Sequence, residues 1–192
     1  MIFDQVFKTM KIVFEGIVLR PWSFKDADQL ANIANNKNIA DNLRDGLPFP
    51  YSLSDAQNWL NSVIPVNDPP RFFAILFENY LAGSIGIVTK EDIYRKNVEI
   101  GYFLAEEYWG KGIMTKAIKA ATAYAFSRFD IVRVYAESFA DNHGSRRVLK
   151  KAGFICEAVI KNNIFKNGVV KDSCIYSVLK ENFHYQIPLT EQ

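Results

Sequence analysis

The sequence predicts a single mixed α/β domain. The chain has 192 residues, the size of one domain, and its 49% hydrophobic content supplies a full core. Aromatic residues reach 14%, which favours a strand-rich core. Runs with the two-residue period of strands alternate with runs at helical spacing along the chain. We expect residues 13–183 to form the domain, with a loosely held lead-in over residues 1–12 and a C-terminal tail over residues 184–192.

The N-terminal half predicts two helices set among strands. Residues 16–21 (GIVLRP) form a strand that a proline stops. Ser23 begins the sequence S-F-K-D, a capping-box pattern, and apolar residues follow it at helical spacing. A loop over 38–51 comes next, and a second helix opens at Ser54 with Gln57. Strands are expected over 72–77, 81–88 and 98–104.

The C-terminal half ends in a hairpin. Asn167-Gly168 lies between two β runs, and this dipeptide is a strong hairpin signal because both residues accept positive φ. Counting back from that turn, Cys174 faces about Lys161. Gly153 marks the end of a short helix. The expected elements are a helix over 115–127, a strand over 131–139, a helix over 145–152, and strands over 154–165 and 169–179.

The composition excludes several classes of function. Lys and Arg number 23 and Asp and Glu number 21, so the net charge is only +2 and supplies no basic field for nucleic acid. Residues 1–15 mix charged with apolar positions, unlike a signal peptide, and no stretch approaches the ~20 apolar residues that span a bilayer. Two cysteines and two histidines have no metal-ligand spacing. We therefore expect a cytoplasmic monomer or homodimer with no metal, nucleic-acid or membrane partner.

The strongest local pattern is a strand, a glycine loop and a helix. The loop AEEYWGKG (105–112) precedes a helix, and glycines there let successive backbone N–H groups face one concavity. Such a helix N-terminus is a site for a di- or polyphosphate. A Walker loop is excluded because Gly112 follows Lys111, and a dinucleotide fingerprint is excluded because Thr115 takes its last position. A plain strand-to-helix turn is the alternative for this segment alone.

A second motif distinguishes these alternatives. After the next strand comes NHGSRRVLKKAGF (142–154), and together with YWGKGIMTKA (108–117) it resembles the GNAT superfamily of acyl-CoA-dependent N-acyltransferases. The likeness runs from about residue 13 to 180 and is strongest for the branch that acetylates the N-termini of ribosomal proteins. It implies a twisted, mostly antiparallel central sheet flanked by helices, with one splayed pair of strands at the acyl-CoA site.

The resemblance also implies a set of acetyl-CoA contacts. The pyrophosphate is expected on backbone amides of the glycine loop, where Glu107 replaces the family's leading Gln or Arg. The pantetheine arm is expected along the strand end, with Asn142 bonding its amide or capping the helix, two compatible roles. The expected contacts are Phe103, Leu104, Trp109, Gly110, Lys111, Gly112, Ile113, Met114, Asn142 and Ser145.

One candidate for catalysis comes from the same resemblance, and a second comes from the chemistry of the reaction. Many family members use a tyrosine as donor to the leaving thiolate, where this chain has Leu149; in the branch that it resembles, the position of Ser145 has this role. The alternative donor to the thiolate is water, and the structural interpretation of Ser145 is that it caps the helix. Glu99 is the candidate base, because the attacking amine must be neutral, with Glu157 and Asp172 as weaker candidates. An α-amine with a pKa of ~7.7–8.0 can react without a dedicated base.

The acceptor is expected to enter over the loop 42–51 and to meet the last hairpin, contacting Arg44, Tyr51 and Asp172. It is the primary amine of a protein N-terminus or of a small molecule, which attacks the thioester directly within a ternary complex without a covalent acyl-enzyme. The basic cluster over 146–151 faces the 3′-phosphate of CoA or is a solvated helix face. The rival function is a catalytically silent CoA-binding sensor or scaffold.

Overall fold

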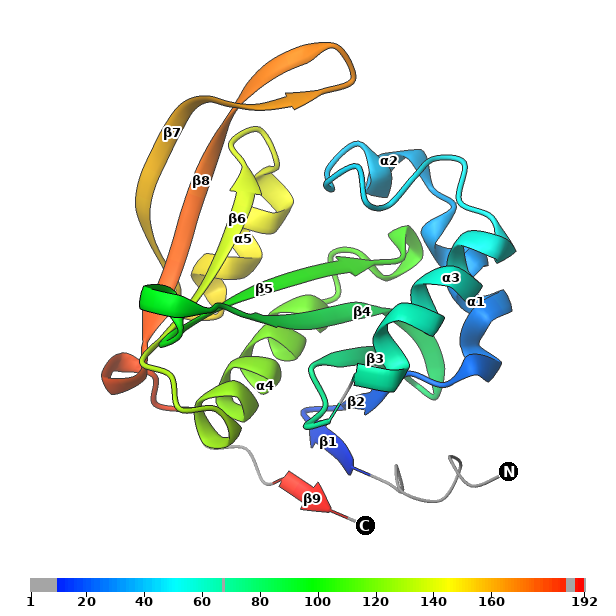
Figure 1. Ribbon diagram of the computed structural model, residues 1–192, viewed down its shortest axis with the longest axis horizontal. Helices are drawn as coiled ribbons and strands as arrows, with labels where there is room; N and C mark the ends of the chain where they lie inside the picture. Colours follow the sequence, from blue (N-terminus) through cyan, green and yellow to red (C-terminus); the bar gives the residue numbers. More distant parts are fainter. Residues whose placement is uncertain (1–9, 67, 186–188, 192) are drawn as a thin grey trace.

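The computed structural model describes residues 10–66, 68–185 and 189–191 (Figure 1). The strands are β1 (Met10–Phe14), β2 (Ile17–Pro21), β3 (Phe72–Phe77), β4 (Tyr80–Thr89), β5 (Asn97–Leu104), β6 (Arg133–Phe139), β7 (Ile155–Lys166), β8 (Val169–Leu179) and β9 (Leu189–Glu191). The α-helices are α1 (Ala27–Ala34), α2 (Lys37–Ala40), α3 (Leu53–Val63), α4 (Ile113–Arg128) and α5 (His143–Lys151). Short 3₁₀ turns are η1 (Phe24–Asp26), η2 (Ile64–Val66), η3 (Asp92–Tyr94), η4 (Glu106–Tyr108) and η5 (Lys180–Asn182).

The described strands form one nine-stranded sheet in the order β7-β8-β6-β5-β4-β3-β2-β1-β9. Every neighbouring pair is antiparallel except β5 and β6, which are parallel. These two strands pair only from Asn97↔Arg133 to Glu99↔Tyr135, and beyond that point they separate (Figure 1). The predicted mixed fold and its splayed strand pair are therefore confirmed.

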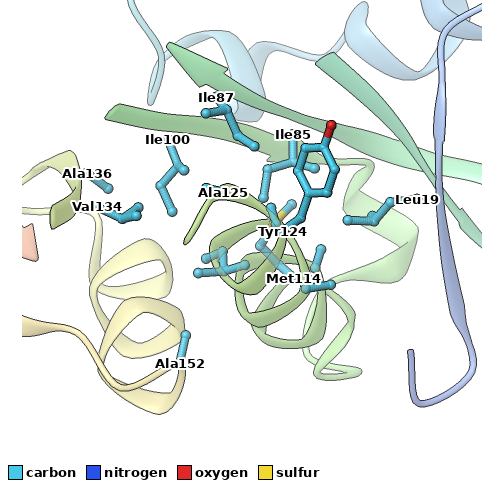
Figure 2. Close-up of a cluster of buried hydrophobic side chains, with 14 of the residues drawn as sticks. Leu19, Ile85, Ile87, Ile100, Met114, Tyr124, Ala125, Val134, Ala136 and Ala152 are labelled. Carbon is cyan, nitrogen blue, oxygen red and sulfur yellow. The ribbon is translucent and has the colours of Figure 1, made fainter. Parts of the chain in front are cut away.

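Helices cover both faces of the sheet. α4 is buried against one face, where Met114, Tyr124 and Ala125 meet residues of several strands such as Leu19 and Ile100 (Figure 2). α1 and α3 cover the other face, with a second apolar cluster that includes Leu30, Leu60, Ala74 and Leu81. The alternation of side chains along β3 explains both layers, since Phe73 and Ile75 belong to the first cluster and Ala74 to the second.

The helix ends agree with most of the sequence signals. Ser23 and Asp26 form the predicted capping box at the entry to η1 and α1. Gly153 follows α5 with a φ of +94°, as expected of a helix C-terminus. The predicted start of the second helix is wrong: the capping box of α3 is formed by Ser52 and Asp55, and Ser54 lies inside the helix. Both serines have an acceptor three residues later, so the capping-box pattern alone does not choose between them.

The last hairpin turns where the sequence predicts, but the strand pairing away from the turn differs from the predicted register. Asn167 and Gly168 have φ values of +52° and +79°. The β7–β8 register shifts between Ile160 and Ile164, so Cys174 lies opposite Val159 instead of Lys161. A bulge adds residues to one strand, and counting from the turn ignores it.

The sheet extends further toward the N-terminus than the sequence predicts. Residues 10–12, expected in the lead-in, belong to β1, which pairs with β2 and with β9. Ile12 is fully buried there. The first nine residues of the expected lead-in lie outside the described residues. Within the expected loop over 38–51, α2 occupies the first positions. Across the described ranges, no helix is long and apolar enough to cross a membrane.

Candidate active site

The separation of β5 from β6 opens a cleft of about 1150 Å³. That volume exceeds the roughly 300–1,000 Å³ of pockets for drug-sized ligands. The N-termini of α4 and α5 line one part of the cleft, and the segment 42–47 and the β7–β8 hairpin line another. One cleft therefore connects the N-termini of α4 and α5 with the segment 42–47 and the β7–β8 hairpin.

The glycine loop places the N-terminus of α4 at the cleft. Gly110 and Gly112 both have a φ of +77°, a left-handed conformation that glycine adopts at no steric cost. A Cβ built on either glycine meets nothing within 4 Å, so the space beside both is open. No side chain caps α4, whose N-cap is Gly112. The first-turn N–H groups, which have no acceptor within a helix, are thus available to an anion.

Trp109 and Lys111 are less available to a ligand than the other expected contacts in the loop. The backbone N–H of Trp109 donates to the carbonyl of Glu106 at 3.0 Å, and its indole N–H donates to the carbonyl of Leu104 at 2.8 Å. Trp109 therefore anchors the loop to the end of β5. The Lys111 ammonium lies 5.3 Å from the centre of the Tyr108 ring, and Lys111 is not among the residues that line the cleft.

The N-terminus of α5 faces the same cleft. The side-chain oxygen of Asn142 accepts a hydrogen bond from the N–H of Ser145 at 3.0 Å, so Asn142 caps α5. The Ser145 hydroxyl oxygen lies 2.8 Å from the hydroxyl oxygen of Tyr102 on β5. Leu149 is fully buried. Ser145 and Tyr102 thus form a pair of hydroxyl groups on the wall of the cleft.

The basic cluster of α5 divides into two parts. Arg147 and Lys151 line the cleft. Arg146 instead donates to the Tyr176 hydroxyl and, at 2.7 Å, to the carbonyl of Ala140, so it stabilises the local fold. Only the first pair is placed to meet a negatively charged ligand.

Glu99 lies on the opposite side of the cleft within a network of charges. One carboxylate oxygen is 2.6 Å from the Arg44 guanidinium, and the other is 2.8 Å from the Lys90 ammonium. Burial alone raises the pKa of Glu99, but the hydrogen bond from Lys90 and the charge of Arg44 outweigh it, so this pKa lies below its ordinary value. Glu99 is therefore ionised at neutral pH, and both its oxygens are occupied.

A second carboxylate shares the same guanidinium. Glu137, on β6, is 3.1 Å from Arg44 and also accepts from the Asn163 side chain at 2.8 Å. The Arg44 side chain is 69% exposed, and that of Glu99 is 11% exposed. Arg44 thus lies over two carboxylates, and it is the member of the group most open to solvent.

The β7–β8 hairpin holds the segment that carries Arg44. The Lys166 ammonium is 2.7 Å from the Asp45 carboxylate, and Asn167 donates to Asp41 at 2.8 Å. These two contacts join the turn of the hairpin to the segment before and after Arg44. The loop over which the acceptor is expected to enter thus contacts the last hairpin, and the contact of the acceptor itself with that hairpin stays a prediction.

The other expected acceptor residues lie in different places. Tyr51 lines the cleft, and burial together with the charge of Asp55 raises its pKa to about 12. Asp172 is not among the lining residues: it pairs with Lys161 at 2.8 Å and accepts from the N–H of Asn162, so it stabilises the bulge in β7. Glu157 pairs with Arg133 and Ser177, also away from the cleft.

The sequence does not single out Tyr102, Glu137 or Lys90 as site residues. Tyr102 and Glu137 both lie on the strands that splay, which is the one local signal that points to them. Lys90 follows β4 and is brought to Glu99 by the antiparallel pairing of β4 with β5. In the part of the chain that the structure describes, no group of three His, Cys, Asp or Glu residues is placed to hold a metal ion.

Comparisons with known proteins agree on one family. A family model described as an acetyltransferase (GNAT) domain matches residues 17–155. The chain is 32% identical over 181 residues to YdaF of Bacillus subtilis, named as a candidate ribosomal N-acetyltransferase, covering 89% of this chain and 95% of YdaF. It is 24% identical over 164 residues to the spermidine N(1)-acetyltransferase of Escherichia coli, covering 84% of this chain and 86% of that protein.

A solved structure supports the fold in detail. RimL, a ribosomal L7/L12 alpha-N-protein acetyltransferase in complex with coenzyme A, superposes with a TM-score of 0.80 at 24% identity, over 88% of this chain and 97% of RimL. At that identity the likeness concerns the fold.

Proposed function

The chain belongs to the GNAT acetyltransferase family and is an N-acetyltransferase, and we propose that it transfers acetyl from acetyl-CoA to the α-amine of a protein or peptide N-terminus. The observation that carries this choice of acceptor is the charge balance around Glu99. Glu99 and Glu137 are matched there by Arg44 and Lys90. A site without excess negative charge attracts a polyamine weakly, because such a ligand carries several positive charges.

The residues present fit acetyl-CoA as co-substrate. The amides of Gly110 to Met114 and the dipole of α4 suit a pyrophosphate, and Arg147 and Lys151 suit the 3′-phosphate. The unpaired inner edges of β5 and β6 offer backbone groups to an extended pantetheine arm, as in strand addition. Asn142 keeps its amide N–H groups for that arm while its oxygen caps α5.

The mechanism that we propose is direct attack of the amine on the thioester within a ternary complex. Neither Cys156 nor Cys174 lines the cleft, which supports a route without an acyl-enzyme. Ser145 donates a hydrogen bond to the departing sulfur. Because Glu99 is paired and its pKa is lowered, its role is to hold Arg44 and Lys90 in place while water removes the proton of the amine. We place this reaction in the cytoplasm.

The test is release of thiol from acetyl-CoA with three matched acceptors. The first is a peptide with a free N-terminus and no lysine, the second is the same peptide with a blocked N-terminus and one internal lysine, and the third is spermidine. We expect the highest kcat/KM for the free N-terminus, with mass spectrometry placing the acetyl group there. A higher kcat/KM for spermidine or the lysine peptide would overturn the choice of acceptor.

The rival function is a silent CoA sensor, and the same assay separates it. A sensor would bind CoA in calorimetry and release no thiol with any acceptor. Turnover with even one amine excludes it.

A further inference from the structure

The hydroxyl of Ser145 has a partner that the family motifs do not assign. Tyr102 reaches from β5 to within 2.8 Å of the Ser145 hydroxyl oxygen, and both residues line the cleft. Elsewhere in the family a tyrosine donor comes from α5, where this chain has the buried, apolar Leu149. This chain therefore places a phenol beside the cleft from a strand instead of from a helix.

The environment of Tyr102 fixes its ring and keeps its proton. Its neighbours on the same face of β5, Ile100 and Leu104, are buried in the main core, and Tyr102 is packed against that core. Burial raises the pKa of the Tyr102 hydroxyl above its ordinary value, although the hydrogen bond with Ser145 lowers it in part. The group is therefore an O–H at every pH at which the enzyme works, held by a side chain with little freedom.

We propose that Tyr102 is a positioning residue that donates its hydrogen bond to Ser145 and so directs the Ser145 O–H toward the sulfur of the departing thiolate. A phenol O–H is more acidic than the O–H of serine, so Tyr102 is the better donor and Ser145 the better acceptor of the two. One lone pair of the Ser145 oxygen then accepts from Tyr102, and the hydrogen of Ser145 points to the cleft. This inference rests on the proposed acetyl transfer.

The bonds and protons of the step balance without a proton from tyrosine. The new C–N bond forms as the C–S bond of the thioester breaks, and the electron pair of that bond stays on sulfur. Ser145 donates a hydrogen bond to the sulfur, and Tyr102 supports Ser145. The surplus proton of the attacking nitrogen goes to water, and water supplies the proton of the product thiol.

Glu99 and the hydroxyl pair of Tyr102 and Ser145 lie on opposite faces of the sheet. Side chains alternate along β5, so Glu99 and Phe103 lie on the face covered by α1 and α3. Tyr102 lies on the other face, toward α4 and α5, as its contact with Ser145 shows. An amine that approaches from the Glu99 side therefore has the hydroxyl pair on the far side of the thioester, where the sulfur leaves.

The experiment is a double-mutant cycle with Tyr102→Phe and Ser145→Ala, assayed with the best acceptor. We expect Ser145→Ala to lower kcat by ~10²–10³, as loss of a donor to developing charge does. We expect Tyr102→Phe to lower kcat about 10-fold, the effect of one ordinary hydrogen bond. In the Ser145→Ala background Tyr102→Phe should have no further effect, since the partner through which it acts is gone. The KM for acetyl-CoA should stay unchanged in both single variants.

The matched control is Tyr124→Phe, which removes the hydroxyl of another buried tyrosine that does not line the cleft. Its kcat should equal that of the wild type. Calorimetry with CoA and thermal unfolding should give wild-type values for Tyr102→Phe, which excludes a loss of binding or fold.

Two results would overturn the inference while the wild type remains active: a wild-type kcat in Tyr102→Phe, or a full 10-fold loss from Tyr102→Phe in the Ser145→Ala background. A wild type that binds CoA but acetylates no amine would instead overturn the proposed function.

Discussion

A single guanidinium bridges two carboxylates on the side of the cleft where we propose that the acceptor binds. Arg44 contacts the carboxylates of Glu99 and Glu137, which lie on the two strands that separate. In the proposed function, an arriving amine would meet a carboxylate pair that is already paired with cations, and Arg44 is the exposed member of that group. The pH dependence of the reaction should then follow the acceptor and not Glu99.

We therefore expect kcat/KM for a peptide α-amine to rise with pH and level off near about 7.7–8.0, the pKa of the amine itself. The reason is that the pKa of Glu99 lies below its ordinary value of 4.5, so its carboxylate does not titrate in this range. The profile should have the same inflection in the wild type and in Glu99→Gln, at a lower rate in the variant. The measurement covers about pH 6 to 9.5. An inflection well below the pKa of the acceptor that disappears in Glu99→Gln would make Glu99 the base.

Gly112, the N-cap of α4, is the residue that tests the proposed binding of the co-substrate. We expect Gly112→Asp to abolish CoA binding, because a carboxylate about 4 Å from a phosphate costs roughly 4 kcal/mol, or about 10³ in affinity. The fold should persist, since Asp tolerates a left-handed φ and its Cβ meets no atom within 4 Å. Gly16→Asp is the matched control, with a φ of +84°, equally open space and no place in the cleft. Calorimetry should give wild-type CoA affinity for Gly16→Asp, and the same result for Gly112→Asp would exclude the glycine loop as the binding site.

Some of the residues that line the cleft could be predicted from the sequence, but the contacts between them could not. Family motifs point to Ser145 and Asn142, and the need for a neutral amine points to Glu99, a carboxylate on a central strand. The contact of Arg44 with Glu99 joins residues 55 positions apart. It depends on the β7–β8 hairpin, which holds the segment of Arg44 through the ion pair of Lys166 with Asp45. Asp172 shows the opposite case: alternation along β8 allows it to face the cleft, but the bulge in β7 engages it elsewhere.

At the scale of elements, we propose that the N-terminus of α5 combines a structural cap with a binding group. Asn142 uses its oxygen for the N–H of Ser145, and in this proposal its amide N–H groups serve the pantetheine arm. Asn142→Asp should keep the cap and raise the KM for acetyl-CoA, because Asp caps equally well but cannot donate. Asn142→Ala should raise the KM similarly and also lower the free energy of unfolding by about 1 kcal/mol. Urea unfolding and steady-state kinetics separate the two effects; an unchanged KM in Asn142→Asp would leave Asn142 a cap alone.

Elements with strong local signals were predictable within a few residues. The glycine loop, α4, the end of α5 at Gly153 and the Asn167-Gly168 turn depend on local backbone conformation, so the sequence determines them directly. β1 was missed because its residues MKIVF have charged and apolar neighbours typical of a mobile lead-in, and only pairing with β2 makes them a strand. The position of Cys174 was missed because a bulge leaves no reliable signal in a single sequence.

At the scale of the whole molecule, the candidate active site is a break in an otherwise continuous sheet. All nine described strands belong to that sheet, and β5 and β6 part in its interior, with other strands on either side. α4 covers the core beneath it, with Tyr124 among its fully buried side chains (Figure 2). Ionisable side chains are buried both at the cleft (Glu99) and in this core (Tyr124), so the free energy of unfolding should depend on pH.

We expect the free energy of unfolding to be nearly constant from about pH 6 to 9 and to fall on both sides. The folded pKa of Glu99 lies below its ordinary value of 4.5, so its contribution is present above that value and is lost as the pH falls below it. Burial raises the pKa of both Tyr51 and Tyr124 from 10.0 to about 12, so their contribution is present below 10.0 and is lost as the pH rises toward 12.

Urea unfolding at a series of pH values, followed by tryptophan fluorescence, measures both limbs. Tyr124→Phe should flatten the alkaline limb, by on the order of 2 kcal/mol at its upper end. At neutral pH this variant should be at least as stable as the wild type, because the Tyr124 hydroxyl is buried with no hydrogen-bond partner among the described residues. Glu99→Gln should flatten the acid limb and leave the alkaline limb as it is. If Tyr124→Phe lost stability at neutral pH and kept the full alkaline limb, ionisation of this core tyrosine would not be what limits the fold at high pH.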